Sequence, residues 1–265
     1  MQTNLSPSLR VFLTLGYGFL YLPILTLIIF SFNASRQVTV WQGFSTKWYL
    51  SLFQDKILIK SLWVSLQVAT SAATFAIILG TLAAIALVRF GRFKGRGLLG
   101  ILTTAPMIMP EVITGLSLLL LFVGLEQIIG WPQGRGILTI TLAHTTLCMA
   151  YVTIILRGRL ADMDLSLEEA ALDLGARPFK VFITIVLPLI SPALISGWLL
   201  AFALSLDDLV IASFVAGPGS STLPMVIFSS IRFGITPQIN ALATIIITTV
   251  AMGVMIAGWL MHRKK

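Results

Sequence analysis

The stretch 168–188, EEAALDLGARPFKVFITIVLP, is a polar, helix-forming segment in a chain that is otherwise strongly apolar. Alanine and leucine favour a helix at its start. Gly175 suits the left-handed position that follows a helix, and Pro178 suits the first turn of the next one. The sequence predicts two short helices joined by a glycine turn, with the second running to Leu187 and stopped by Pro188.

The first of these helices has a recognisable start. Ser166 followed three residues later by Glu169 has the spacing of a capping box. The polar face is acidic, whereas a helix lying on a membrane surface typically carries lysine and arginine there. Leucines around it give apolar surface, and Ala170 and Ala171 leave room for close approach. Two interpretations stay open on these residues alone: docking of a partner, or an ordinary interfacial helix.

The rest of the chain has the composition of an integral membrane protein. Of 265 residues, 57% are hydrophobic and 11% are charged, against about 25% charged in soluble domains; mean hydropathy is +0.97. The formal net charge is +8, but the basic residues cluster at the ends of apolar segments as topology signals do. This arrangement argues against a nucleic-acid partner. The single cysteine, Cys148, excludes an intrachain disulfide.

Apolar segments near the ~20 residues needed to cross a bilayer recur six times. We expect an all-α bundle with spans at 10–32, 62–88, 98–125, 137–156, 193–214 and 239–261. The first is too long for the apolar region of a cleaved signal peptide and is interpreted as an uncleaved anchor.

Lysine and arginine set the orientation. Twelve of the 18 fall on the side that holds both termini and the loop 157–192, so the positive-inside rule places these in the cytoplasm. The opposite side has longer loops at 33–61 and 215–238. Trp41, Trp48 and Tyr49 in the first of them suit either an interfacial aromatic belt or a surface that receives a partner.

Three acids fall inside expected spans: Glu111, Asp207 and Asp208. Each costs about 2.5–3.5 kcal/mol near a helix centre, so such groups usually face a cavity or a partner. No lysine or arginine is expected within a span to neutralise them. If their helices are continuous, Glu111 and Asp207 lie at similar heights, and they are the preferred pair for a translocation path. Alternatively, the acids hydrogen-bond to serine, to threonine or to a sister subunit and only brace the bundle. His144 is interpreted as a hydrogen-bonded residue between helices.

The loop resembles a known family. Its pattern is similar to the EAA loop of permease subunits in bacterial binding-protein-dependent ABC importers at every defining position: Glu169, Ala170, Ala171, Gly175, Ile185, Leu187 and Pro188. The segments 87–97, 110–123, 196–224 and 237–245 resemble the polyamine branch, the putrescine permeases most closely and the spermidine permeases as near relatives. The resemblance implies a type-I importer permease bundle in the inner membrane, with a coupling helix seated in a cytoplasmic ATPase.

The same resemblance implies domain boundaries and partners. Residues 1–60 would hold an extra helix and an outer loop, 61–260 the permease domain with its coupling loop at about 157–192, and 261–265 a cytoplasmic tail. The partners would be an ATPase dimer that binds ATP and magnesium, a homologous second permease, a periplasmic polyamine-binding protein and membrane lipid. The chain itself would need no cofactor or metal.

Two other classes fit the sequence less well. An ion-coupled secondary transporter would use the intramembrane acids, but the sequence has no obvious inverted repeat and that class leaves the loop unexplained. A membrane-embedded enzyme would need a nucleophile or a metal set, and neither a catalytic Ser/His/Asp set nor an HExxH pattern is present. The sequence also has no P-loop, so ATP hydrolysis would fall to a separate subunit.

Overall fold

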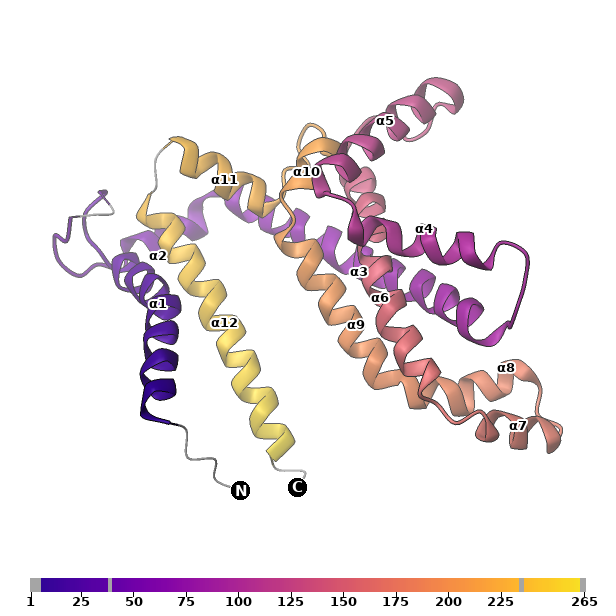
Figure 1. Cartoon of the computed structure of the whole chain (residues 1–265). Coiled ribbons are helices and arrows are strands. Elements are labelled where there is room, and N and C mark those ends of the chain that lie inside the picture. Colours follow the sequence, from indigo (N-terminus) through magenta and orange to yellow (C-terminus); the bar gives the residue numbers. More distant parts are fainter. Residues whose placement is uncertain (1–5, 38–39, 234–235, 263–265) are drawn as a thin grey trace. The chain divides into compact units, whose positions relative to one another are not determined.

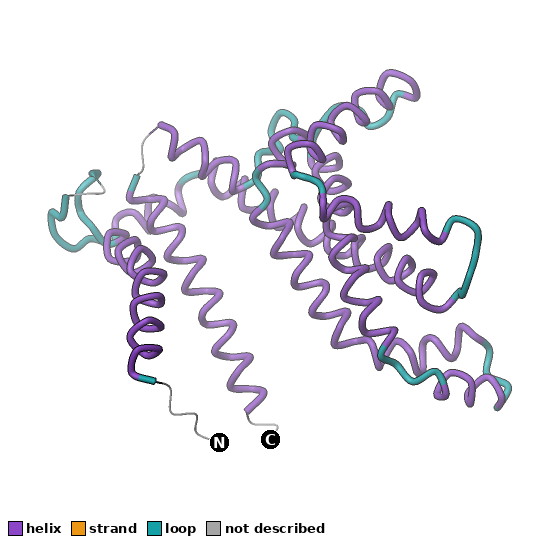
Figure 2. The backbone as a smooth tube through the Cα atoms, in the orientation of Figure 1, coloured by secondary structure: helices purple, strands orange, loops and turns teal. Residues whose placement is uncertain are grey.

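The computed structural model describes residues 6–37, 40–233 and 236–262, and regular structure in these ranges is helical (Figures 1 and 2). The chain forms two compact units: one contains residues up to Ile59 and from Ile227 onward, and the other contains Lys60–Val226. The helices are α1 Pro7–Ser31, α2 Lys47–Gln54, α3 Lys56–Arg89, α4 Arg96–Ile108, α5 Glu111–Ile129, α6 Ile137–Ala161, α7 Ser166–Asp173, α8 Pro178–Val181, the π-helix η1 Phe182–Val186, α9 Leu187–Asp207, α10 Val210–Val215, α11 Leu223–Phe233 and α12 Pro237–His262.

The larger unit is organised around α6, which packs against α9 and α4 along its length. Ala73, Ala76 and Ala84 of α3 join Val152 and Leu156 of α6 in one buried cluster. Small residues let α3 approach α6 closely, because a Cβ added at Gly80 would lie 2.6 Å from Val152 Cγ1. Within a bilayer the hydrophobic effect does not drive helices together, so close van der Waals packing of this kind stabilises their association.

A second cluster in the same unit joins α5, α6 and α10, with Phe122, Ile140 and Ile211 buried. Gly115 of α5 allows α10 to approach closely, since a Cβ there would lie 2.7 Å from Phe214 Cδ2. Thr139 of α6 donates a hydrogen bond to the Val215 carbonyl at 2.7 Å, which satisfies the end of α10.

The smaller unit packs α12 against α1 and α2. The loop after α1 folds around buried Asn33, whose side-chain amide bonds four backbone groups of the loop. Trp48 donates its indole N–H to the Asn33 carbonyl at 2.7 Å, and Tyr49 bonds Ser31 at 2.7 Å. These two aromatic residues therefore have an intramolecular role, while Trp41 stays exposed.

Two expected spans differ from the structure. The segment 98–125 is two helices rather than one, because Met109 is extended ahead of Pro110 (φ −75°, ψ 141°), as a residue before proline tends to be. The segment 193–214 is interrupted after Asp207, and Asp208 is extended (ψ 124°). Within the described residues, five helices are long and apolar enough to cross a membrane. The expected sixth span corresponds to α12, and the count of six stays a prediction.

Candidate functional site: the α7–α9 loop and the carboxylates at helix ends

Helix α7 starts differently from the prediction. Leu165 is its N-cap, and no side chain of the capping residue bonds the helix. Instead, the Asp164 carboxylate accepts a hydrogen bond from Ser166 N at 2.9 Å. The capping-box prediction is wrong because the helix begins one residue earlier in register, so that Ser166 is already helical. Hydrogen bonds from the Ser166 backbone and side chain hold the pKa of Asp164 below its ordinary value.

The glycine turn is confirmed. Gly175 has a φ of +83°, Gly175 N donates to the Leu172 carbonyl at 2.9 Å and Ala176 N donates to the Ala171 carbonyl at 3.0 Å. These two bonds define a Schellman motif, which satisfies the last carbonyls of α7. Pro178 occupies the first turn of α8, as expected.

The second helix does not stop at Pro188. Residues Phe182–Val186 wind as the π-helix η1, and Leu187 N donates to the Phe182 carbonyl. The wider π turn accommodates Pro188, which has no N–H to donate to the preceding turn. One helical rod therefore continues from Pro178 to Asp207 over 30 residues, or about 45 Å at 1.5 Å per residue.

The loop residues of the expected coupling site separate into two groups. Glu169, Ala170, Gly175 and Pro188 are exposed, whereas Ala171, Ile185 and Leu187 are partly covered. Large apolar side chains stand out beside them: Leu174 is 89% exposed and Phe179 74% exposed. The arrangement leaves a short helix with an exposed apolar rim, and α7 has no buried residue of its own.

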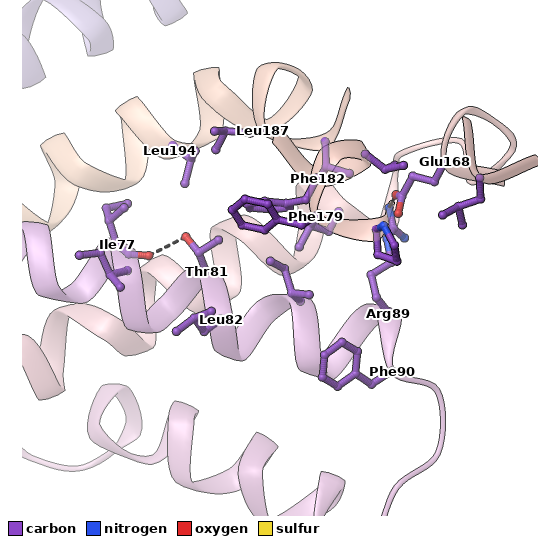
Figure 3. Close-up of a pocket in the computed structure, with 17 residues that line it drawn as sticks. Ile77, Thr81, Leu82, Arg89, Phe90, Glu168, Phe179, Phe182, Leu187 and Leu194 are labelled. Carbon is purple, nitrogen blue, oxygen red and sulfur yellow. Dashed lines mark hydrogen bonds and ion pairs between the residues drawn. The ribbon is translucent and has the colours of Figure 1, made fainter. Parts of the chain in front are cut away.

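A cavity of about 600 Å³ lies between α3, α7–α8 and the start of α9 (Figure 3). Phe179 and Phe182 project into it, and Ile77 and Leu82 of α3 lie on its opposite wall. At its polar end, Arg89 Nη2 lies 2.8 Å from Glu168 Oε1. The sequence did not point to this ion pair, because its two residues lie far apart in the chain, at the end of α3 and the start of α7.

The three intramembrane acids lie at breaks in helices rather than within them. Glu111 is the first residue of α5, following Pro110 as N-cap, and a carboxylate is favourable at that helix end. Asp207 is the last residue of α9 and Asp208 is its C-cap. The expected continuous helix is therefore wrong for the segment that leads to Glu111, whereas α9 is continuous up to Asp207.

The adjacent carboxylates Asp207 and Asp208 have different surroundings. Asp207 is exposed. Asp208 is 8% exposed; its Oδ1 accepts a hydrogen bond from Ala212 N at 2.9 Å and lies 3.3 Å from His144 Nε2. The sequence did not indicate this neighbour of Asp208, because His144 lies on a different helix.

His144 connects α6 to the end of α9. Its Nδ1 lies 2.7 Å from Ser205 Oγ, and only 1% of the residue is exposed. The prediction of an interhelical hydrogen bond is confirmed. Ser205, which lies in the last turn of α9, was missed by sequence reasoning. Asp208 is thus an anchor of the α9–α10 break, and Asp207 remains available to a ligand.

Comparison with known proteins identifies the class to which this fold and loop belong. The family model of binding-protein-dependent transport system inner membrane components matches residues 76–263. The chain belongs to this family, whose members are transport subunits.

Two relatives show which transport systems have permeases similar to this chain. The chain is 59% identical over 258 residues to the putrescine transport system permease protein PotI of Escherichia coli K12, covering 97% of this chain and 92% of the relative. It is 40% identical over 254 residues to the spermidine/putrescine transport system permease protein PotC of the same organism, covering 96% and 93%. The expected likeness to the putrescine branch is confirmed.

Solved structures share the fold. A bacterial ABC transporter involved in the import of the acidic polysaccharide alginate aligns with a TM-score of 0.71 at 17% identity, covering 97% of this chain and 98% of that one. The MetNI methionine ABC transporter aligns with a TM-score of 0.62 at 15% identity, covering 78% and 94%. The prediction of an all-α importer-permease fold is confirmed.

Proposed function

We propose that this chain is a permease subunit of an ATP-driven importer of polyamines, with putrescine as its substrate. The single observation that carries the proposal is 59% identity to a putrescine permease across 97% of the chain. The 40% identity to a spermidine/putrescine permease makes spermidine the second candidate. Both are flexible cations that carboxylates and aromatic faces recognise.

The proposed assembly contains a homologous second permease, two copies of a cytoplasmic ATPase and a periplasmic binding protein. In the proposed orientation both termini and the α7–α8 loop are cytoplasmic. The binding protein docks on the outer loops 33–61 and 215–238. Helix α7 sits in a groove of the ATPase, and its lack of buried residues supports a surface that is covered only in the complex.

Alternating access follows from the continuity of the rod behind this loop. When ATP binding closes the ATPase pair, the loops of the two permeases move together. The helix from Pro178 carries that movement to Asp207 at its far end, and the bundle opens outward. Substrate then enters along a path that includes Glu111 and Asp207, which are exposed carboxylates at helix ends. Hydrolysis of ATP resets the bundle.

Reconstitution tests this proposal. The chain would be purified with its second permease and ATPase, placed in liposomes and supplied with binding protein loaded with putrescine or with spermidine. We expect putrescine-loaded protein to stimulate both ATP hydrolysis and uptake. Stronger stimulation by spermidine would reassign the substrate, and stimulation by neither would contradict the proposed polyamine function.

A further inference from the structure

The C-terminal end of α3 is tied to α7 by a partly covered ion pair. Arg89 Nη2 and Glu168 Oε1 lie 2.8 Å apart, and their side chains are 15% and 19% exposed. Among the residues that the structure describes, this pair is the polar side-chain contact that links α7 to a membrane helix. Figure 3 shows Arg89 extending from α3 toward Glu168 at the edge of the cavity.

Apolar packing contributes little on the α7 side of the same junction, because α7 has no buried residue. A cavity of about 600 Å³ is lined by α3, by the α7–α8 loop and by the start of α9, although α3 and Ile190 near the start of α9 also share one buried apolar cluster. Dispersion contacts are lost wherever a void replaces partner atoms. The position of α7 relative to α3 therefore depends on the ion pair more than it would at a filled interface.

Both charges also suit the helices that carry them. Arg89 lies in the last turn of α3 and Glu168 in the first turn of α7. A cation at a helix C-terminus and an anion at a helix N-terminus are each favourable. Partial burial keeps the pair less screened by salt than a surface pair. The contact is thus supported by the helices on both sides.

We propose that Arg89 is a positioning residue that links α7 to α3, so that movement of the loop passes into two membrane helices. One route is covalent, through α8 and η1 into α9. The other is ionic, through Glu168 and Arg89 into α3. This inference rests on the proposed function, because only an ATP-driven permease has a loop movement to transmit.

Three variants test the link in the complete reconstituted complex: Arg89→Met, Glu168→Gln and the reversed pair Arg89→Glu with Glu168→Arg. Putrescine uptake and ATP hydrolysis are measured in the same liposomes, and their ratio is the readout. We expect each single variant to lower uptake per ATP by about fivefold or more, the lower end of usual coupling between sites. The reversed pair should recover part of that loss, because it restores the attraction but places each charge at the unfavourable end of its helix.

Arg92→Met is the matched control. It removes the same charge three residues later, from an exposed side chain without an ion pair in the described structure. Its uptake per ATP should equal that of the unmodified complex. Glu168→Gln keeps the size and shape of the side chain and removes only its charge, so it remains informative if Arg89→Met fails to assemble.

The outcomes separate this inference from the proposed function. Unchanged uptake per ATP in Glu168→Gln, or a reversed pair no better than the weaker single variant, would overturn the ionic link. A loss in Arg92→Met equal to that in Arg89→Met would also overturn it, by making the effect one of general charge. Absence of putrescine-stimulated hydrolysis in the unmodified complex would instead contradict the proposed function.

Discussion

The α7–α8 turn and the α9–α10 break both end a helix within a few residues, but different forces hold them. The α7–α8 turn is local: Gly175 and two backbone hydrogen bonds within six residues close it. The α9–α10 break depends on His144, which is 64 positions away from Asp208 along the chain. The first can form before the bundle does, whereas the second requires the packed bundle.

The largest effect on stability is expected at Asp208, whose contact with His144 is long-range in sequence. Asp208→Ala removes the acceptor of Ala212 N and leaves His144 without its carboxylate. Leaving a buried hydrogen-bonding group without its partner costs about 1–3 kcal/mol. We expect a lower midpoint of thermal unfolding in detergent and less assembled complex, with Asp207→Ala as the neighbouring control. Equal midpoints for the two variants would contradict the anchoring role of Asp208.

A variant of Asp207 should lower transport and leave stability unchanged, in contrast to Asp208→Ala. Asp207→Asn keeps the size of an exposed side chain, so assembly should be unchanged. If a substrate ammonium binds this carboxylate, losing a charge-assisted hydrogen bond of about 1.5 kcal/mol lowers uptake roughly tenfold. Uptake by the reconstituted complex measures this, and Glu111→Gln tests the second carboxylate in the same way. Unchanged transport in both variants would remove these residues from the path.

The α7–α8 turn should be destabilised by backbone strain at Gly175 alone, without a steric clash. Gly175→Ala places a side chain at a φ of +83° with nothing within 4 Å of the new Cβ. The left-handed conformation then costs about 1 kcal/mol, which favours other loop conformations roughly fivefold. We expect weaker binding of the ATPase, measured by titration of the purified permease pair.

Gly158→Ala provides the control for that change. Its Cβ also meets nothing within 4 Å, but it lies inside α6, where alanine favours the helix. ATPase affinity should stay the same or rise slightly. A similar loss of affinity in both variants would argue that added volume, rather than strain at Gly175, is responsible.

The smallest effect concerns acidity at the start of α7. The pKa of Asp164 is lowered below its ordinary value of 3.8 by hydrogen bonds from Ser166. A lowered folded pKa stabilises the helix start above that ordinary value, and the contribution is lost as pH falls through the lowered pKa. Hydrogen exchange of residues 165–175 should accelerate, relative to Asp164→Asn, only below about pH 4. Parallel exchange in the two proteins at every pH would contradict this.

The sequence predicted those features of the fold that depend on neighbours along the chain. Gly175 and Pro178 have the expected roles because left-handed φ and a first-turn proline are local requirements. Pro188 was misjudged because a proline can either end a helix or be accommodated by a π turn, and only the winding of 182–186 decides which. Pro110, in contrast, does separate two helices.

The candidate site was predictable to a similar extent. The residue types of the loop and of the intramembrane acids stood out in the sequence, since both are polar groups in an apolar chain. Their partners did not. His144 meets Ser205 and Asp208 only because α6 and α9 pack together. Arg89 meets Glu168 at the edge of a cavity that hydrophobic periodicity does not reveal.

The central claim is that force enters through the α7–α8 loop from another polypeptide. The most direct measurement is putrescine uptake into liposomes that contain the permease pair, with and without the ATPase and ATP. The account predicts uptake only when the ATPase, ATP and loaded binding protein are all present. Uptake by the permease pair alone, without nucleotide, at the rate of the complete system would contradict it.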